Sequence, residues 1–474
     1  MIDIHFGTDG WRGVLHEDFT LENVRVVAQA IADYINSTSL PKKELAVGYD
    51  ARTLSPESAT AITEVLAGNG IRVLLGNGIV TTPILVYAIK HHSLAGGVMV
   101  TASHNPPRFN GIKFKPYYAG SADEKITAAI ESFLWKNPPK SLPASEASKK
   151  GLLRLEDLSA PYEPNLRAYV DMRILNEAGL KVVADPMHGA QGRVIERILS
   201  DTSCRVKTIH AEPDSSFGGL SPEPIPPHTE ELQKAVLAEK ADVGVAADAD
   251  GDRVGAVDSK GNFITAHQII AMLLLHLYNN RGMRGIVVKT ITTSTLIEKI
   301  AASLRLPFRE TAVGFKHICE IMRNEDVLIG GEESGGISFK NYFPERDGAL
   351  CALLLLELMA TESKKLEDIL AEIDARYGSF RYRRKDIRYP EEKKSMLFET
   401  LRANPPDSLA GRKVVEVKSF DGVKFILDND DWLIFRASGT EPKLRVYAEA
   451  KSLDEVDKLL SIGDSLAEEV ARRD

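Results

Sequence analysis

The chain repeats one local pattern three times: an apolar strand, a polar turn and a helix with apolar residues at helical spacing. The copies begin near Glu44, Leu180 and Gly285, spaced on the order of a hundred residues apart. In the first copy, Ser55 is expected to cap the helix and Pro56 to occupy its first position. Because such units bury sheets beneath helices, the pattern predicts three α/β domains of similar plan. We expect their sheets to be mixed.

A chain of 474 residues is too long for a single hydrophobic core. A proline-rich stretch at 137–150 and a polar turn at 257–262 are candidate joins between domains. A third join falls in the basic segment 376–384, beyond which four strand-like runs and a closing helix predict a smaller α+β domain. We therefore predict four domains around a central cleft, with boundaries at 1–150, 151–258, 259–378 and 379–474.

Composition excludes several classes of protein. A formal net charge of −8 without a basic block argues against broad nucleic-acid binding. The cysteines at 204, 319 and 351 fit neither a disulfide framework nor a zinc site, which favours a reducing compartment. No signal peptide is visible, and the longest apolar runs are too short to span a bilayer. We expect a cytoplasmic protein without membrane contacts. To bind anionic substrates, such an acidic protein needs arginine and lysine side chains placed together in particular loops.

The first candidate site is a serine placed where an apolar run ends. Residues 97–100 suit a buried strand, and the polar turn Thr101–Pro106 follows, with Ser103 and His104 at its centre. Ligands of open α/β sheets bind at strand ends, so a hydroxyl there is placed for chemistry. Serine, asparagine and proline are also ordinary turn residues, and a plain turn is the alternative interpretation.

The second candidate site is a run of three aspartates, Asp248, Asp250 and Asp252, after the strand-like segment 241–247. Alternate residues of an extended segment point the same way, so the three carboxylates can converge. Convergent carboxylates repel one another, and a divalent cation relieves that repulsion; oxygen ligands favour Mg²⁺ over zinc. A calcium EF-hand loop would need other residues at Arg253 and Ser259, whereas a solvated acidic loop stays open as an alternative.

Two further loops combine glycine with polar side chains. Gly330–Gly336 places two acids and a hydroxyl among four glycines, which suits the donors of a sugar, although a simple glycine turn is the alternative. Arg436–Arg445 combines backbone donors around Gly439 with hydroxyls and arginines, which suits a phosphate dianion. This second loop lacks the Gly-Lys-Ser/Thr end of a nucleotide P-loop.

In their order and spacing, the four motifs resemble those of the α-D-phosphohexomutase family. Thr101–Pro106 resembles its phosphoserine loop, Asp248–Arg253 its metal loop, Glu332–Gly336 its sugar-specificity loop and Arg436–Thr440 its phosphate-binding loop. Ala249 replaces a common glycine at a position where no side chain binds the metal. The nearest members are bacterial or archaeal phosphoglucomutases and phosphomannomutases.

The resemblance implies that Ser103 carries a phosphoryl group and completes a Mg²⁺ shell with the three aspartates. It implies catalytic roles for Lys113 and Arg12, and places His104 beside the nucleophile to position phosphate. As a base for a sugar hydroxyl, Lys113 would need a pKa lowered by about three units, or about 4 kcal/mol, which burial beside Mg²⁺ and Arg12 would supply. The alternative is that Lys113 only neutralises phosphate. The implied substrate ligands are Arg253, Lys289, His317, Glu332, Ser334, Arg436, Ser438, Gly439, Thr440 and Arg445.

The implied reaction interconverts glucose 1-phosphate and glucose 6-phosphate through glucose 1,6-bisphosphate, which also acts as the activator. Gly336 stands where many dual-specificity members have histidine, which puts activity on mannose phosphates in question. The alternatives are a phosphoglucosamine mutase, a catalytically silent sugar-phosphate-binding paralogue, and a phosphatase that releases free phosphate. Hexose phosphates are the expected partners, and a monomer or a homodimer is the expected state.

Overall fold

The structure is a computed structural model that describes residues 2, 4–7, 9–437 and 443–472. The chain divides into two compact units, of which the first comprises Met1–Ile286 and Gly314–Asp368. The second comprises Val287–Val313 and Ile369–Asp474, so the predicted domain 259–378 contributes residues to both units. Among the residues that the structure describes, no helix combines the length and the apolar character needed to cross a membrane.

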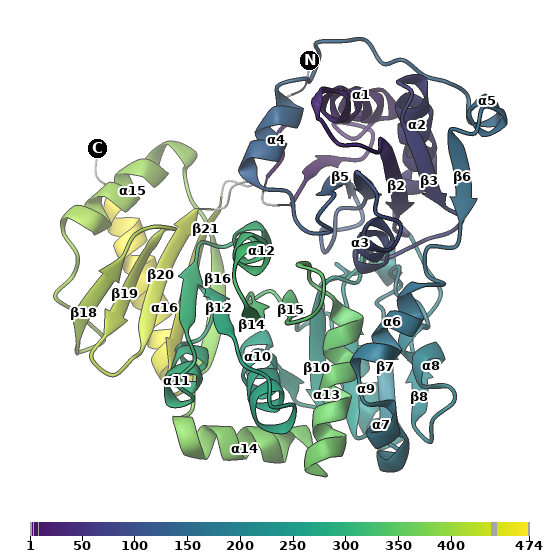
Figure 1. Cartoon of the computed structure of the whole chain (residues 1–474). Coiled ribbons are helices and arrows are strands. Elements are labelled where there is room, and N and C mark those ends of the chain that lie inside the picture. The colour runs from purple at the N-terminus through teal and green to yellow at the C-terminus, as the bar shows by residue number, and fades with distance from the viewer. Residues whose placement is uncertain (1, 3, 8, 438–442, 473–474) are drawn as a thin grey trace. The chain divides into compact units, whose positions relative to one another are not determined.

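Six strands form the first sheet, in the order β1-β5-β4-β2-β3-β6. They are β1 (Trp11–Val14), β2 (Glu44–Tyr49), β3 (Arg72–Gly76), β4 (Gly96–Val100), β5 (Phe109–Pro116) and β6 (Leu153–Glu156). Strands β2, β3, β4 and β6 are parallel, whereas β5 runs antiparallel to both β4 and β1. Helices α2 (Ser55–Gly68) and α3 (Thr82–His91) pack on its central strands, as Figure 1 shows. Apolar side chains such as Leu45 and Val98 form the core beneath them.

A second mixed sheet in the same unit has the order β11-β10-β9-β7-β8. Its strands are β7 (Lys181–Asp185), β8 (Arg205–Thr208), β9 (Val243–Ala247), β10 (Val254–Asp258) and β11 (Phe263–Ile264). Strand β9 is parallel to β7 and antiparallel to β10. The first unit also contains the antiparallel pair β14 (Val327–Gly331) and β15 (Ile337–Phe339). These pairings leave polar turns after β4, β9 and β14.

The second unit contains the parallel pair β12 (Ile286–Thr290) and β13 (Phe308–Thr311), with an antiparallel sheet from the C-terminal part. That sheet has the order β16-β21-β20-β19-β18-β17. Its strands are β16 (Arg381–Arg388), β17 (Ser408–Leu409), β18 (Arg412–Lys418), β19 (Val423–Leu427), β20 (Trp432–Ala437) and β21 (Lys443–Ala450). Phe425, Leu433 and Val446 belong to its core.

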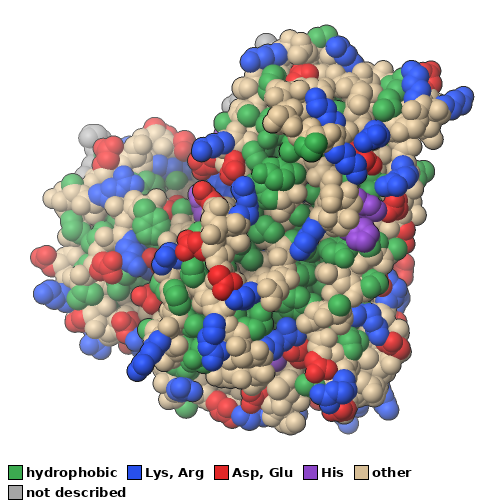
Figure 2. Space-filling model, viewed as in Figure 1, with side chains coloured by type: hydrophobic (Ala, Val, Ile, Leu, Met, Phe, Trp, Pro, Cys, Tyr) green, Lys and Arg blue, Asp and Glu red, His purple; other side chains and the backbone are tan. Residues whose placement is uncertain are grey.

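The remaining helices connect or cover these strands. They are α1 (Leu21–Ser37), α4 (Glu124–Glu131), α5 (Ala144–Lys149), α6 (Tyr162–Tyr169), α7 (Met172–Ala178), α8 (Val194–Leu199), η1 (Phe217–Gly219), α9 (Glu230–Glu239), α10 (Ala266–Leu275), η2 (His276–Asn280), α11 (Thr295–Ser303), α12 (Phe315–Asn324), α13 (Gly348–Glu362), α14 (Leu366–Tyr377), α15 (Glu391–Ala403) and α16 (Leu453–Ala471). On the face shown in Figure 2, acidic and basic side chains are interspersed, so neither sign of charge dominates that face.

The predicted mixed sheets and smaller C-terminal domain are confirmed, but one local expectation is wrong. Ser55 does not cap α2, because Leu54 occupies the cap position with φ 64°. The Ser55 hydroxyl instead donates to Asp50 Oδ1 at 3.0 Å. The basic segment 376–384, predicted as a join, runs from the end of α14 to the first residues of strand β16. Four consecutive β16 residues are exposed, so no alternation of apolar side chains marked this edge strand.

His210 contacts two carboxylates that come from neighbouring elements of the second sheet. Its Nδ1 lies 3.0 Å from Asp185 Oδ1 at the end of β7, and its Nε2 lies 2.9 Å from Glu231 Oε2 on α9. The ring of His188 lies 4.7 Å away. The hydrogen bond to Asp185, with a further contribution from Glu231, outweighs partial burial and raises the pKa of His210 to about 9.

This raised pKa predicts a pH-dependent contribution to stability. Because the pKa in the folded state exceeds the unfolded value of about 6.5, the stabilisation is complete below that pH and is lost as pH rises through about 9. We expect the difference in free energy of unfolding between the wild type and His210→Gln to become smaller by about 1 kcal/mol as pH rises through this window. The change is modest because solvent screens the half-buried ion pairs. Urea titrations at several pH values measure the difference, and a constant difference would contradict the prediction.

Candidate active site

Polar turns at the ends of strands bring the predicted catalytic groups of the first unit together. Ser103 lies between β4 and β5, and the aspartate run lies between β9 and β10. Lys113 lies on β5, and its register partner is Met99 on β4. Arg12 lies on β1 opposite Gly111 on β5. The antiparallel pairing of β5 with two neighbours therefore places a lysine and an arginine beside the serine turn.

The Ser103 hydroxyl contacts the aspartate run directly. Ser103 Oγ donates to Asp248 Oδ2 at 2.8 Å, although the two residues are 145 positions apart. Both side chains are buried, and Ser103 has a left-handed backbone with φ 50°. Left-handed backbone is strained for a residue with a side chain and costs roughly 1 kcal/mol or more. The Thr101 hydroxyl accepts a hydrogen bond from Ser103 N at 2.8 Å, which helps to hold this conformation.

The three aspartates converge as predicted, although through a tight turn at 249–251 and not along an extended segment, and their chemistry fits a hard divalent cation. One carboxylate oxygen from each lies within 4.8 Å of the others, and all three side chains are buried. Oδ1 of Asp250 and Oδ1 of Asp252 are buried without a hydrogen-bond partner in the described part of the chain. Burial and repulsion by Asp250 and Asp252 raise the pKa of Asp248 well above its ordinary range. Orphaned oxygens and mutual repulsion are what Mg²⁺ would relieve.

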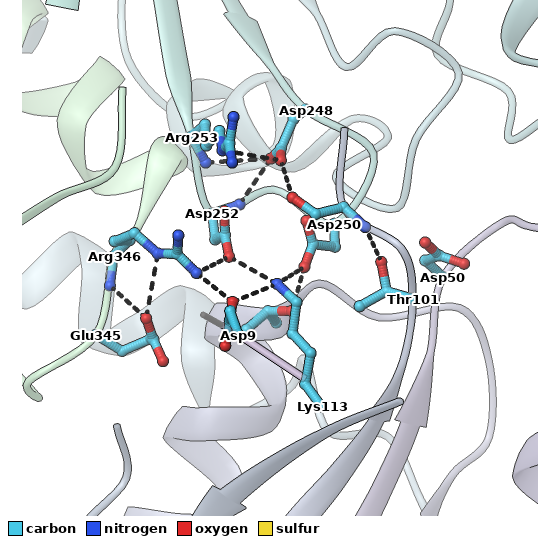
Figure 3. Close-up of polar contacts among 12 residues, drawn as sticks. Asp9, Asp50, Thr101, Lys113, Asp248, Asp250, Asp252, Arg253, Glu345 and Arg346 are labelled. Carbon is cyan, nitrogen blue, oxygen red and sulfur yellow. Dashed lines mark hydrogen bonds and ion pairs between the residues drawn. The ribbon is translucent and has the colours of Figure 1, made fainter. Parts of the chain in front are cut away.

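Lys113 supplies positive charge to the same cluster, as Figure 3 shows. Its Nζ lies 2.8 Å from Asp250 Oδ2, 3.1 Å from Asp252 Oδ2 and 2.9 Å from Asp9 Oδ2. Burial alone would lower the pKa of Lys113, but these carboxylates raise it above its ordinary value. The predicted depression of this pKa is therefore wrong for the arrangement seen, because it did not anticipate three surrounding carboxylates. Lys113 is a cation here.

Arg346, which the sequence analysis missed, joins the cluster from the segment before α13. Its Nη2 contacts Asp9 Oδ2 at 2.5 Å and Asp252 Oδ2 at 2.7 Å (Figure 3). Its Nε lies 3.3 Å from Glu345 Oε1. Lys115 in turn contacts Glu345 at 2.6 Å. The available signal was the charged run Glu-Arg-Asp at 345–347 directly before a helix made almost entirely of apolar residues.

The predicted sugar loop is ordered by its own backbone and by Arg346. Glu332 is buried, and its Oε1 accepts from Gly314 N at 3.0 Å while Oε2 lies 3.6 Å from Arg346 Nη1. Burial raises the pKa of Glu332 despite this cation. A Cβ at Gly336 would lie 2.2 Å from Arg346 Cδ, so the arginine fills the space that a larger residue would need. Ser334 in this loop is half-buried.

Four further predicted residues lie near the serine turn or at the edge of the sugar loop. Arg12 Nη1 donates to Asn105 Oδ1 at 2.6 Å, and burial together with the charge of Arg253 lowers the pKa of Arg12. Arg253 Nε lies 3.8 Å from Asp248 Oδ2. His104 is half-buried in the serine turn. His317 lies in the first turn of α12, which begins one residue after Gly314.

The other predicted ligands belong to the second unit. Arg436 and Arg445 are register partners on β20 and β21, so two like charges stand directly opposite each other. Such a pair is destabilising unless anions compensate it, and Asp421 Oδ1 lies 3.0 Å from Arg436 Nε. Arg445 Nε is buried without a hydrogen-bond partner in the described residues. Lys289 Nζ contacts Glu310 Oε1 at 2.6 Å. Ser438, Gly439 and Thr440 lie outside the described residues.

Comparison with known proteins places this fold and site in a family. Four sequence profiles of phosphoglucomutase/phosphomannomutase match in order: alpha/beta/alpha domain I over 3–140, domain II over 160–261, domain III over 265–377 and the C-terminal domain over 386–461. A phosphoglucomutase/phosphomannomutase of Thermococcus kodakarensis is 31% identical over 468 residues, or 98% of this chain and 99% of the relative.

Two other relatives extend the comparison. A phosphoglucosamine mutase of Caldicellulosiruptor bescii is 30% identical over 454 residues, which cover 96% of each chain. A crystal structure from Thermus thermophilus, provisionally named a phosphomannomutase, has a TM-score of 0.87 and 33% identity, covering 98% of this chain and 99% of that one.

The matched domains define the class of protein, an isomerase that acts as an intramolecular phosphotransferase. The chain belongs to the α-D-phosphohexomutase family, and all four domains of that family are present. Relatives of similar identity carry different substrate names, so the sugar has to be argued from the site.

Proposed function

We propose that this chain is a Mg²⁺-dependent phosphoglucomutase that interconverts glucose 1-phosphate and glucose 6-phosphate. The observation that carries the proposal is the 2.8 Å contact between Ser103 Oγ and Asp248 Oδ2, within a cluster where three carboxylate oxygens converge. A serine that served only a turn would have no reason to face a cation site. The contact therefore favours a hydroxyl that accepts and returns a phosphoryl group.

The proposed cycle consists of two phosphoryl transfers through Ser103. In the first, the bond between Ser103 Oγ and phosphorus breaks, a bond from the sugar 6-hydroxyl oxygen to phosphorus forms, and the hydroxyl proton passes to the freed Ser103 Oγ. In the second, the bond between the sugar 1-oxygen and phosphorus breaks in the reoriented glucose 1,6-bisphosphate, the phosphoryl group passes to Ser103 Oγ, and the Ser103 proton passes to the 1-oxygen. This step regenerates the phosphoserine and releases glucose 6-phosphate. Positioning and neutralisation of charge are the main requirements of such transfers.

The cations of the first unit would neutralise the transferred group. Asp248, Asp250 and Asp252 would hold Mg²⁺, which supplies Lewis-acid stabilisation of phosphoryl oxygens when it is bound. Lys113 and Arg12 would add positive charge beside Ser103, since Lys113 is held as an ammonium by its carboxylate neighbours. His104 would help to orient the phosphoryl group.

The phosphate that does not react would bind in the second unit. Arg436 and Arg445 stand opposite each other on β20 and β21, and in the sequence they flank Ser438, Gly439 and Thr440. A phosphate dianion would compensate the facing arginines and accept from the buried Arg445 Nε. Lys289 would contribute a further cation.

The sugar would be recognised by Glu332 with Ser334, His317 and Arg253. Arg346 occupies the space beside Gly336, so this loop lacks room for the histidine that many dual-specificity members have there. We therefore propose a preference for glucose phosphates over mannose phosphates. The relatives named phosphoglucosamine mutase support a second candidate, activity on glucosamine 1-phosphate.

A coupled assay of the purified protein with three sugar 1-phosphates tests the proposed substrate. With Mg²⁺ and trace bisphosphate, we expect kcat/KM for glucose 1-phosphate to exceed that for mannose 1-phosphate by at least about tenfold, the discrimination that a contact with one hydroxyl commonly provides. Glucosamine 1-phosphate as the fastest substrate would overturn the glucose assignment in favour of the second candidate. Release of free phosphate would indicate a phosphatase, and binding without turnover a silent paralogue.

A further inference from the structure

A buried arginine without an assigned role lies directly behind the serine turn. Arg52 follows β2, and its side chain has 0% solvent exposure. Its Nη1 donates to the carbonyl oxygens of Pro106 at 3.1 Å and Phe109 at 2.9 Å. Its Nη2 donates to the carbonyl oxygens of Asn105 at 2.6 Å and of Ser103. One guanidinium thus binds four carbonyls of the segment 103–109.

The guanidinium is itself held in place by two other contacts. Its Nε lies 3.3 Å from Asp50 Oδ2, and the backbone N–H of Arg52 donates to Asp50 Oδ1 at 3.0 Å. The ring of Phe217, from η1, lies 4.8 Å from the guanidinium carbon. The ion pair with Asp50 and the ring of Phe217 restrict the movement of the guanidinium. The arginine is therefore a rigid support whose hydrogen bonds face the serine turn.

The serine turn has a physical need for such a support. Ser103 adopts a left-handed backbone with φ 50°, which an unsupported turn would tend to leave. A phosphoserine carries roughly two negative charges, and Ser103 faces the carboxylate of Asp248. Repulsion between these groups would drive the turn away from the aspartates, whereas four bonds to its carbonyls oppose that movement. A lysine has a single ammonium and could not satisfy four carbonyls in this planar arrangement.

We propose that Arg52 is a positioning residue that clamps the serine turn and so keeps Ser103 Oγ against the aspartate cluster. The inference rests on the proposed function, since it assigns Arg52 to the transfer steps at Ser103. Arg52 acts through the backbone of the turn and touches neither sugar nor phosphate. Its loss should slow phosphoryl transfer without weakening substrate binding, because misplacement of a reacting atom by about 1 Å can cost about a hundredfold in rate.

The test compares Arg52→Lys with Arg108→Lys. Arg108 is an exposed arginine of the segment 103–109. Steady-state kinetics with glucose 1-phosphate should show a fall in kcat of about a hundredfold for Arg52→Lys, with KM within about twofold of the wild type. Arg108→Lys should match the wild type in both constants. Hydrogen exchange on the same proteins should show faster exchange confined to residues 101–109 in Arg52→Lys. Unchanged kcat and exchange would overturn the proposal, as would a general loss of protection across the first unit.

Two provisions keep the result decisive. If Arg52→Lys does not fold, Phe217→Leu loosens the same guanidinium from another segment and should lower kcat severalfold at constant KM; unchanged kcat would overturn the proposal. If the wild-type protein lacks activity on hexose phosphates, the proposed function fails, and hydrogen exchange alone then decides whether Arg52 clamps the turn.

Discussion

The Ser103→Ala variant is expected to fold normally and to lose isomerase activity by at least about 10⁴-fold, the scale on which removal of a nucleophile acts. The Ser103 hydroxyl is the group of this turn that contacts Asp248, so its removal takes away the proposed carrier of the phosphoryl group. The variant gives up one hydrogen bond to Asp248, which contributes about 1 kcal/mol to stability. A coupled assay with glucose 1-phosphate measures the activity, and thermal unfolding measures the stability.

Ser93→Ala is a matched control for this experiment. Ser93 has nearly the same left-handed backbone as Ser103, with φ 51° against 50°, but it is exposed. Its replacement should leave both activity and unfolding temperature unchanged. Substantial turnover by Ser103→Ala would rule out the proposed route of the phosphoryl group. Failure of that variant to fold would favour the interpretation of residues 101–106 as a structural turn.

The Asp250→Asn variant is expected to lose most Mg²⁺-supported activity, by about a thousandfold, or about 4 kcal/mol of transition-state stabilisation. The substitution removes one of three converging carboxylates but keeps an oxygen that can accept from Thr82 Oγ1, which lies 2.6 Å from Asp250 Oδ2. The fold should therefore persist while cation affinity falls. Titration with Mn²⁺, followed by electron paramagnetic resonance, measures binding independently of activity.

Asp242→Asn provides the matched control for the metal site. Asp242 directly precedes β9, at the end of that strand opposite the aspartate cluster, and its Oδ2 accepts from Lys181 N at 2.8 Å. This variant should bind Mn²⁺ and turn over as the wild type does. Equal Mn²⁺ affinity in Asp250→Asn and the wild type would show that the three carboxylates do not form the cation site.

Local sequence was sufficient where the relevant geometry is local. The convergence of Asp248, Asp250 and Asp252 is confirmed, but the reason given for it is wrong. The run was expected to be extended, with alternate side chains on one side, whereas residues 249–251 form a tight turn in which Gly251 has φ 71°. Ser103 was recognised because an apolar strand ends abruptly at a polar turn, and β4 does end at Val100. The repeated strand, turn and helix accounts for parallel strands such as β2 and β4, but not for the antiparallel strands β5 and β10.

Contacts between distant segments were beyond local reasoning. Arg346 and Asp9 are 337 positions apart, and neither has a neighbouring motif that indicates the other. The error in the Lys113 pKa has the same origin, because its carboxylate partners come from distant segments of the chain. Arg52 was overlooked for a different reason: its acceptors are backbone carbonyls, which carry no sequence signal at all.

The most direct measurement of the central claim is mass spectrometry of the tryptic peptide 91–108, which contains Ser103. The protein is incubated with Mg²⁺ and glucose 1,6-bisphosphate, separated from small molecules, and divided before a chase with excess glucose 1-phosphate carrying an isotopic label in its phosphate. The account predicts one phosphate on Ser103 before the chase and its replacement by labelled phosphate afterwards. A protein that isomerises the sugar while Ser103 remains unmodified throughout would contradict it.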